Sequence, residues 1–443
     1  MADRVTVIGW DGSPLTAAAR SALSAATLVA GAAHHLALPE VPPTAERIRL
    51  GSLGLAARRI AGHRGTAVVF ADGDPGFFGA VRTLRAPEHG LEVEVVPAVS
   101  AVAAAFARAG MPWDDAQVVV AHPRTLRRAV NVCRAHGKVA VLTSPGAGPA
   151  ELALLLGPVH RTFVICEELG TAREQVTVVT SDRAADHSWR DPNVVIVIGG
   201  TAAHPGPAAP GAAGAQGAYG GQGANGAHGV HGAYGAHGAY GGHGGQPHAA
   251  DPAWLLGHHP ARTAERGWAR PHPDAGEGES APLRAAQLAR LGPRTGDLVW
   301  DIGTGTGALA VEAAAFGAAV IAVDADPRAC ERATAAARRR GVQLQVVTGR
   351  APHVLEDLPE PDVVRVGGGG AEVVAAVAER RPERIVSHAS TRDGAEAIGR
   401  ALTAGGYTVE CALLQSVGLD PHTWDEQDRS VVFLLAAERP VNR

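Results

Sequence analysis

Short runs of branched apolar residues recur along the chain, and each is followed by a turn containing Gly, Pro or Ser and then by a segment rich in Ala, Leu or Arg. Such runs lie at residues 4–10, 67–71 and 299–302. Runs this short form strands, whereas the segments that follow have the length and composition of helices. Alternating strands and helices predict an α/β fold in which helices cover the sheets.

The segment after the first run carries the signals of a helix start. Its helix is predicted to begin near Leu15, because Ser13 and Thr16 can each cap it and Pro14 suits a first turn. Similar transitions follow the run at residues 67–71 and the later run before Pro97. Because ligands bind beyond the carboxyl ends of parallel strands, the loops that follow these runs are the candidate binding loops.

Residues 201–250 differ from the rest of the chain because they consist mainly of Gly, Ala and His and contain no charged side chain apart from His. Such a segment cannot bury enough apolar surface to offset the entropy lost on ordering. We interpret residues 201–251 as a disordered linker between a domain at 1–200 and a second domain at 252–443. Its histidines lack a preformed geometry, so we expect no metal site there.

Composition narrows the class of protein. The chain has 443 residues, a formal net charge of −4 at pH 7 and a sequence pI near 6.6, which argues against a nucleic-acid partner. No apolar run reaches the roughly 18 residues of a membrane span, and the start of the chain has no signal-peptide pattern. The four cysteines form no CxxC pair, which favours reduced thiols in a cytoplasmic protein without a zinc site.

The N-terminal block contains an ordered series of motifs: "VTVIGWDGSPLT", "DGDPGFFG", "PAVSAVAAAFARAGMPWDDA", "AHPR", "VLTSPGAGPAELA" and "CEELGTAREQV". In this order they resemble the S-adenosylmethionine (SAM)-dependent tetrapyrrole methylases that modify cobalamin precursors. The resemblance implies a two-lobed tetrapyrrole methylase (class III) fold with SAM between the lobes. The positions that match its SAM cleft are Gly73, Asp74, Pro75, Ser100 and Ala101.

This block also departs from the family pattern at two loops. Val99-Ser100 stands where two serines are frequent, and His122-Pro123-Arg124 stands where His-Gly-Arg is common. Pro123 removes a backbone N–H donor, so a contact that this donor makes in relatives is absent here.

The C-terminal block has a glycine turn, Gly303-Thr304-Gly305-Thr306-Gly307, directly after a buried run that ends in Asp301-Ile302. A nicotinamide dinucleotide would favour G-x-G-x-x-G with a pyrophosphate at the helix N-terminus. Here the spacing is G-x-G-x-G and Asp301 precedes it, which suits a cationic ligand. The chain therefore favours SAM, which carries an ammonium and a sulfonium. Asp324 ends the next strand and can accept both ribose hydroxyls, a need that both cofactors share.

Several C-terminal stretches, including "LVWDIGTGTGALAVE", "AVDADPRAC" and "AGGYTVECALLQS", resemble a Rossmann-like class I methyltransferase. Domains resembling the two blocks occur fused in this order in the precorrin-6Y C5,15-methyltransferase (decarboxylating) family. That resemblance implies C5 methylation by residues 1–200, and C15 methylation with decarboxylation of the C12 acetate by residues 252–443. The expected product is precorrin-8 in cobalamin (vitamin B12) biosynthesis. Relatives of both halves associate, so we expect a homo-oligomer with a small-molecule tetrapyrrole substrate.

The resemblance assigns cofactor positions in the C-terminal block, and the substrate's carboxylates imply arginines near the clefts. The cofactor positions are Asp301, Gly303, Gly305, Gly307, Asp324, Arg350 and Ala351. The substrate candidates are Arg124, Arg284, Arg365 and Arg392. Possible proton donors for decarboxylation are His353, His388 and Arg365, and no catalytic residue is assigned.

Three positions depart from the C-terminal family pattern. Arg350 stands where an acid usually faces adenine, Arg365 where Phe is common, and Arg284 approximates a Thr-Lys-Arg-Glu segment. Two alternatives therefore remain open. One is a methyltransferase pair acting on another tetrapyrrole or on rRNA. The other is a protein whose C-terminal half binds SAM with reduced or lost turnover.

Overall fold

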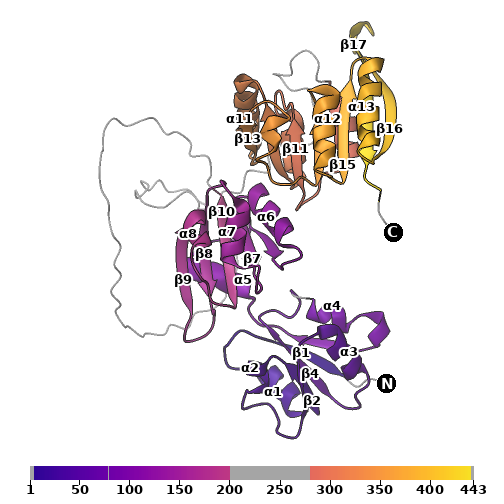
Figure 1. Cartoon of the computed structure of the whole chain (residues 1–443). Helices are drawn as coiled ribbons and strands as arrows, with labels where there is room; N and C mark the ends of the chain where they lie inside the picture. Colours follow the sequence, from indigo (N-terminus) through magenta and orange to yellow (C-terminus); the bar gives the residue numbers. More distant parts are fainter. Residues whose placement is uncertain (1–3, 78, 200–279, 441–443) are drawn as a thin grey trace, which may run out of the picture.

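The computed structural model describes residues 4–77, 79–199 and 280–440. These residues form three sheets, two in the N-terminal part and one in the C-terminal part (Figure 1). The α/β class predicted from the alternating pattern is confirmed, and so are the two lobes expected for the N-terminal part. The predicted linker at 201–251 and the start of the predicted block at 252–443 lie outside the described residues.

The first lobe contains a sheet of five parallel strands in the order β3-β2-β4-β1-β5. Its strands are β1 (Val5–Trp10), β2 (Leu28–Gly31), β3 (Glu46–Arg49), β4 (Ala67–Asp72) and β5 (Val93–Val96). Its helices are α1 (Ala17–Ser24), α2 (Ala33–Leu36), α3 (Leu53–Ala61), α4 (Ala80–Leu84) and the 3₁₀ turn η1 (Pro87–His89).

The first helix begins later than predicted. Thr16 is its cap, and the Thr16 hydroxyl accepts a hydrogen bond from the Ala19 N–H, so α1 starts at Ala17 rather than near Leu15. Leu15 is buried beside the sheet instead. Both Ser13 and Thr16 had the chemistry of a cap, and the burial of Leu15 is a tertiary effect that local sequence does not contain.

The connections of this sheet define a crevice between β2 and β4. The chain leaves β2 toward β3 at one edge of the sheet, whereas it leaves β4 toward β5 in the opposite direction. Two adjacent parallel strands whose connections diverge leave an opening beyond their carboxyl ends, and ligands of open α/β sheets bind there. The strand order therefore selects the loops after Gly31 and Asp72.

The second lobe contains a mixed sheet in the order β6-β7-β10-β8-β9. Its strands are β6 (Gln117–Val120), β7 (Lys138–Leu142), β8 (Arg161–Glu167), β9 (Gln175–Thr180) and β10 (Asn193–Gly199). Its helices are α5 (Ala101–Ala109), α6 (Leu126–Ala135), α7 (Pro149–Leu156) and α8 (Ser181–Ala185). Central β10 is buried along its whole length and pairs antiparallel with both neighbours.

The C-terminal part contains a seven-stranded sheet in the order β13-β12-β11-β14-β15-β17-β16. Its strands are β11 (Leu298–Ile302), β12 (Ala319–Asp324), β13 (Gln345–Thr348), β14 (Val363–Val366), β15 (Arg384–Ala389), β16 (Thr408–Leu419) and β17 (Glu426–Glu438). Its helices are α9 (Ala281–Leu291), α10 (Ala308–Ala315), α11 (Pro327–Arg340), α12 (Gly370–Glu379), α13 (Arg392–Ala404) and the 3₁₀ turn η2 (His353–Leu355).

Residues of β11 alternate between two core clusters. Leu298, Trp300 and Ile302 pack on one face of the sheet, and Val299 packs on the other. Both faces are therefore covered, as expected for the centre of a parallel sheet. The chain leaves β11 toward β12 and β14 toward β15, in opposite directions, so a second crevice lies beyond the carboxyl ends of β11 and β14. Among the described residues, no helix is long and apolar enough to cross a membrane.

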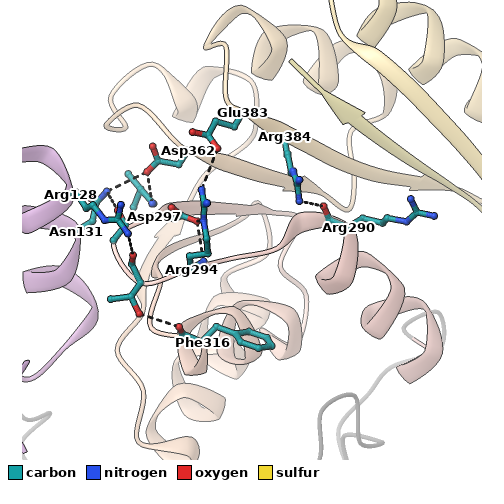
Figure 2. A network of polar contacts seen from close by, with 12 residues as sticks. Arg128, Asn131, Arg290, Arg294, Asp297, Phe316, Asp362, Glu383 and Arg384 are labelled. Atoms are coloured by element: carbon teal, nitrogen blue, oxygen red, sulfur yellow. Dashed lines mark hydrogen bonds and ion pairs between the residues drawn. The ribbon is translucent and has the colours of Figure 1, made fainter. Parts of the chain in front are cut away.

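Helix α6 of the second lobe contacts the C-terminal sheet (Figure 2). The Asn131 side-chain amide donates to the Gly296 carbonyl at 3.1 Å and to Asp362 Oδ2 at 3.4 Å. Arg127 forms an ion pair with Asp362, and Arg128 donates to the Thr295 carbonyl at 3.2 Å. Asp362 also accepts from the Leu298 N–H at 2.7 Å, so it belongs to the fold of the C-terminal sheet as well as to the contact.

These contacts lie at the amino-terminal edge of the C-terminal sheet. Gly296 lies two residues before β11, and Asp362 immediately precedes β14. A third contact, from Arg161 of β8 to the Gln343 side chain at 2.6 Å, involves the segment just before β13. Helix α6 therefore docks on the edge opposite to the crevice beyond β11 and β14.

The substitution Asn131→Asp tests this contact. It places a carboxylate where an amide now donates to Asp362, and like charges at such a distance cost several kcal/mol. We expect the two parts to separate, measured as a larger radius of gyration in small-angle X-ray scattering. Because an amide at 362 can donate to a carboxylate at 131, the double variant Asn131→Asp/Asp362→Asn should restore part of the compact form. An unchanged radius for the single variant would contradict the contact.

Candidate functional site

The glycine turn after β11 has two glycines that packing requires and one that faces open space. A Cβ on Gly303 would lie 3.1 Å from the Gly368 N, and one on Gly307 would lie 2.6 Å from the Ala333 Cα. Around a Cβ on Gly305, the described residues place no heavy atom within 4 Å. All three glycines have positive φ, which glycine adopts without strain. The turn thus presents its middle glycine to the crevice.

Asp301 is fully buried beneath this turn and is already paired. Its Oδ1 accepts from Arg365 Nη1 at 3.0 Å, and its Oδ2 accepts from the Thr304 hydroxyl at 2.7 Å. Arg365 Nη1 also donates to the Gly303 carbonyl at 2.8 Å. The pair therefore ties the end of β11, the glycine turn and β14 together. It also means that the charge of Asp301 is balanced from within the protein.

Arg365 occupies a space that a side chain at Gly367 would fill. A Cβ on Gly367 would lie 2.3 Å from Arg365 Nη1 and 2.4 Å from its Cζ, so glycine is needed there. Arg365 is 6% exposed, and within the described part of the chain its Nε has no hydrogen-bond partner. A buried guanidinium N–H without a partner is a donor still available to a group in the crevice.

Asp324 joins the second strand end to the glycine turn. Its Oδ2 accepts from the Gly305 N–H at 2.9 Å, and its Oδ1 accepts from the Asp326 N–H at 3.0 Å. Each carboxylate oxygen can accept a further hydrogen bond, so Asp324 retains capacity for ribose hydroxyls. The Gly305 N–H, by contrast, already has an acceptor and is not free for a pyrophosphate. This arrangement disfavours a dinucleotide.

The structure places the other predicted C-terminal positions in different surroundings. Arg350 follows β13 and is exposed, next to half-buried Ala351. Arg284 is 1% exposed and donates to Glu312 at 2.9 Å, so it is held in the core beneath α9. Arg284 and Arg365 are thus buried cations with protein acceptors, whereas Arg392, at the start of α13, is exposed.

His388 is held as a neutral imidazole. Burial, together with the nearby charge of Arg365, lowers the pKa of His388 to about 4. Its Nδ1 lies 3.1 Å from Gln287 Nε2, which can donate to it. A neutral His388 near pH 7 has no imidazolium proton to give, which weakens it as the acid of the decarboxylation. His353, in η2, is exposed.

In the N-terminal part, the loops after β1, β4 and β5 converge. A Cβ on Gly9 would lie 2.4 Å from the Gly73 carbonyl oxygen, 2.8 Å from Pro75 Cδ and 2.9 Å from the Ala98 N. A Cβ on Gly73 would lie 3.1 Å from the Ala101 N. These backbone contacts therefore bring together the predicted positions on the loops after β4 and β5, at the carboxyl edge of the sheet.

The remaining N-terminal positions have local roles as well. The Ser100 hydroxyl accepts from the Ala103 N–H at 3.1 Å and caps α5. Asp74 Oδ1 accepts from the Gly76 N–H at 2.8 Å, which shapes the loop after β4. Arg124 is exposed on the loop between β6 and α6.

Three side chains at the crevice between β2 and β4 were not predicted from the sequence: His34, His35 and Asp72. Their ring nitrogens and carboxylate oxygen lie within 4.8 Å of one another. The available signal was a pair of histidines directly after a strand together with an acid at the end of another strand. Sequence alone does not show that β2 and β4 are neighbours, so the two halves of this cluster could not be joined in advance.

Two family models match the chain and indicate a methyltransferase with two parts. The model described as Tetrapyrrole (Corrin/Porphyrin) Methylases matches residues 10–185, and the model described as Precorrin methyltransferase domain matches residues 276–432. The chain is also 31% identical, over 399 residues, to a Precorrin-6Y C(5,15)-methyltransferase (decarboxylating) from a Sinorhizobium species. That alignment covers 87% of this chain and 84% of the relative. The chain belongs to the precorrin-6Y C(5,15)-methyltransferase (decarboxylating) family.

Two shorter relatives match parts of the chain. A Cobalt-precorrin-7 C(5)-methyltransferase from Salmonella typhimurium is 35% identical over 169 residues, covering 37% of this chain and 82% of the relative. A Probable cobalt-precorrin-6B C(15)-methyltransferase (decarboxylating) from Pyrobaculum calidifontis is 35% identical over 160 residues, covering 30% of this chain and 82% of the relative. The resemblance proposed from the motifs is thereby confirmed at the level of the family.

The Asp301–Arg365 pair can be tested by its effect on stability. Arg365→Met leaves the Asp301 carboxylate buried without its cation, and such a loss costs about 3–5 kcal/mol. We expect this loss in the free energy of unfolding measured in urea. The double variant Asp301→Asn/Arg365→Met removes both charges and should recover most of it. If the single variant were as stable as the double variant, the pair would not hold the turn.

The lowered pKa of His388 predicts a pH dependence of stability. Because its folded pKa of about 4 lies below the ordinary value of about 6.5, the unfolded chain binds more protons between these values. The contribution is fully present above about pH 6.5 and is lost as the pH falls toward 4. We expect the urea midpoint to fall less from pH 7 to pH 5 in His388→Gln than in the parent. Exposed His353→Gln is the matched control and should behave like the parent.

Proposed function

We propose that this chain methylates C5 and C15 of a precorrin and removes the carboxyl group of its C12 acetate, giving precorrin-8 in cobalamin biosynthesis. The observation that carries the proposal is the presence of two switch-point crevices, one in each part matched by a methyltransferase family model. We assign C5 methylation to residues 1–200, and C15 methylation with decarboxylation to residues 252–443. The names of the C(5)- and C(15)-methyltransferase relatives support this division.

SAM is the methyl donor that fits both crevices. When bound, it supplies an electrophilic methyl group on a sulfonium and leaves as a neutral thioether. In the C-terminal crevice, Gly305 offers open space at the turn, Asp324 has free acceptor capacity, and Arg365 Nε is an unused donor. In the N-terminal crevice, we assign the corresponding wall to the Gly73-Asp74-Pro75 loop and the loop before Ser100, which pack closely together. The residues present therefore fit a ligand without phosphates.

The chain's own residues have two tasks in such a transfer. The first is alignment, which can contribute several kcal/mol to lowering the barrier when both reactants are held in line. The buried Asp301–Arg365 pair supports this role because it keeps the turn from shifting relative to β14. The second is recognition of the substrate's carboxylates, for which the exposed Arg124 and Arg392 are better placed than the buried, paired Arg284.

The proposal includes a cytoplasmic location, a homo-oligomeric state, and no nucleic-acid or membrane partner. The net charge of −4 at pH 7 supports the absence of a nucleic-acid partner, because nucleic-acid binding depends on clustered basic side chains.

Product analysis tests the proposed function directly. We expect the full chain, supplied with SAM carrying a ¹³C-methyl group and with precorrin-6Y, to give a product that has gained two labelled methyl groups and lost one CO₂. Mass spectrometry reads both changes, and NMR of the labelled methyl groups identifies the methylated carbons. A product with one methyl group, or with retained acetate, would overturn the corresponding half of the proposal.

The double variant Asp301→Ala/Arg365→Met tests the division between the two parts. It removes both buried charges, so no unpaired ion remains in the C-terminal core. The glycine turn loses the ion pair that connects it to β14. We expect C15 methylation and CO₂ loss to fall, by about 100-fold if alignment to within an ångström is lost, with C5 methylation unchanged. Equal loss at both carbons, or retention of C15 methylation, would contradict the assignment.

A further inference from the structure

A cluster of two histidines and one carboxylate lies at the carboxyl edge of the first sheet. His34 and His35 lie in α2, directly after β2, and Asp72 is the last residue of β4. His34 Nε2 is 2.8 Å and His35 Nε2 is 3.0 Å from Asp72 Oδ1, and the two ring nitrogens are 3.1 Å apart. Asp72 immediately precedes Gly73, so the cluster adjoins the loop to which we assign SAM binding.

His35 is built into the core of the lobe. It is 1% exposed, and its ring stacks on Phe70 with the centroids 5.1 Å apart. A Cβ on Gly31 would lie 2.9 Å from the His35 Cβ, so the last residue of β2 must be small. The position of the His35 ring is thus set by packing on β2 and β4.

Hydrogen bonding determines the tautomer of His35. Its Nδ1 lies 3.2 Å from the Ala32 N–H, which donates to it. A neutral imidazole that accepts at Nδ1 carries its proton on Nε2, and here that N–H points to Asp72 Oδ1. Nε2 of His35 therefore has no lone pair for a metal ion. Moving its proton to Nδ1 would place two N–H donors, those of His35 Nδ1 and Ala32, against each other. This argues that the cluster takes part in proton transfer and does not bind a metal cation.

Of the two histidines, His34 is the one that solvent can reach. Its side chain is 52% exposed, and its ring stacks on Trp10 at the end of β1, with centroids 5.8 Å apart. Burial raises the pKa of Asp72, but the hydrogen bonds from His35 and His34 outweigh it and lower that pKa below its usual value. An ionised Asp72 that accepts from His34 Nε2–H leaves the lone pair of His34 on Nδ1.

We propose that His34, oriented by Asp72 and His35, is the base that accepts the proton released by methylation in the N-terminal part. This inference rests on the proposed function. The substrate carbon forms a bond to the methyl group as the carbon–sulfur bond of the donor breaks. The electron pair of the substrate's C–H bond returns to the conjugated ring, and the proton goes to His34 Nδ1. Asp72 then faces an imidazolium and stabilises it, as a carboxylate does in an Asp–His dyad.

Few other charges act on His34. Within the described residues, the ionisable groups in contact with it are Asp72 of β4 and His35 of its own helix, while β1 presents the neutral Trp10 ring. Asp72, as an anion, stabilises the imidazolium that forms when His34 accepts a proton. His35 keeps the carboxylate in place and is a positioning residue.

The experiment uses the full chain, ¹³C-methyl SAM and precorrin-6Y, with C15 methylation in the same molecule as the internal control. His34→Gln should slow C5 methylation by about 100-fold or more, the range of general-base catalysis, and leave C15 methylation and CO₂ loss unchanged. His63→Gln is the matched control, because His63 bonds to Thr27 at the opposite edge of the sheet. It should leave both rates unchanged.

The pH dependence of the rate separates a base from a structural residue. In the parent, the rate of C5 methylation should depend on pH, because only an unprotonated base accepts a proton, and His34→Gln should lose this dependence. Asp72→Asn should slow C5 methylation and leave C15 methylation unchanged. Equal C5 rates in His34→Gln and the parent, or an unchanged C5 rate in Asp72→Asn, would overturn the proposal. So would C5 methylation that a chelator abolishes and zinc restores, because the cluster would then be a metal site. A parent chain without C5 methylation would instead refute the proposed function.

Discussion

Diverging connections from adjacent parallel strands determine where both candidate sites lie. The chain leaves β2 and β4 in opposite directions in the first sheet, and β11 and β14 in the C-terminal sheet. Each divergence leaves a crevice that no crossover helix can cover. The backbone beside each crevice packs closely, with Gly9 against Gly73 in one sheet and Gly303 against Gly368 in the other. Close packing at the strand ends thus requires glycine on two different folds within one chain.

The sequence predicted these loops because their signals are local. An apolar run, a glycine turn and a helix-forming segment are contiguous, so β11, the turn at Gly303–Gly307 and α10 were placed correctly, as was Asp324 at the end of β12. The interaction that stabilises the turn was not predicted. Asp301 and Arg365 are separated by 64 positions, and their contact exists only because β11 and β14 are paired in register. Local pattern suggested an acid facing a cationic ligand, whereas the fold supplies a cation of its own.

The burial of polar residues on helices was also not predictable from the sequence. Asn131 lies in a helix rich in Arg, where an amide is typical of a solvated face, but it is 1% exposed because the C-terminal sheet covers it. The burial of His35 likewise depends on a distant segment, because its ring stacks on Phe70 in β4, which follows much later in the chain. In both cases the residue type was visible, but its partner came from a distant segment. Long-range pairing, rather than propensity, decided the role of each.

The contact made by α6 and the C-terminal crevice lie at opposite ends of one short strand. Asp362 immediately precedes β14 and bonds to Asn131, while Arg365 lies within β14 and bonds to Asp301. At about 3.3 Å per residue, the ends of this strand are separated by roughly 10–13 Å of extended backbone, which hydrogen bonds to β11 and β15 hold on both sides. Docking of α6 at the amino edge therefore leaves the crevice open, while the pairing of β14 on both sides keeps the backbone of Asp362 and Arg365 in fixed register with β11.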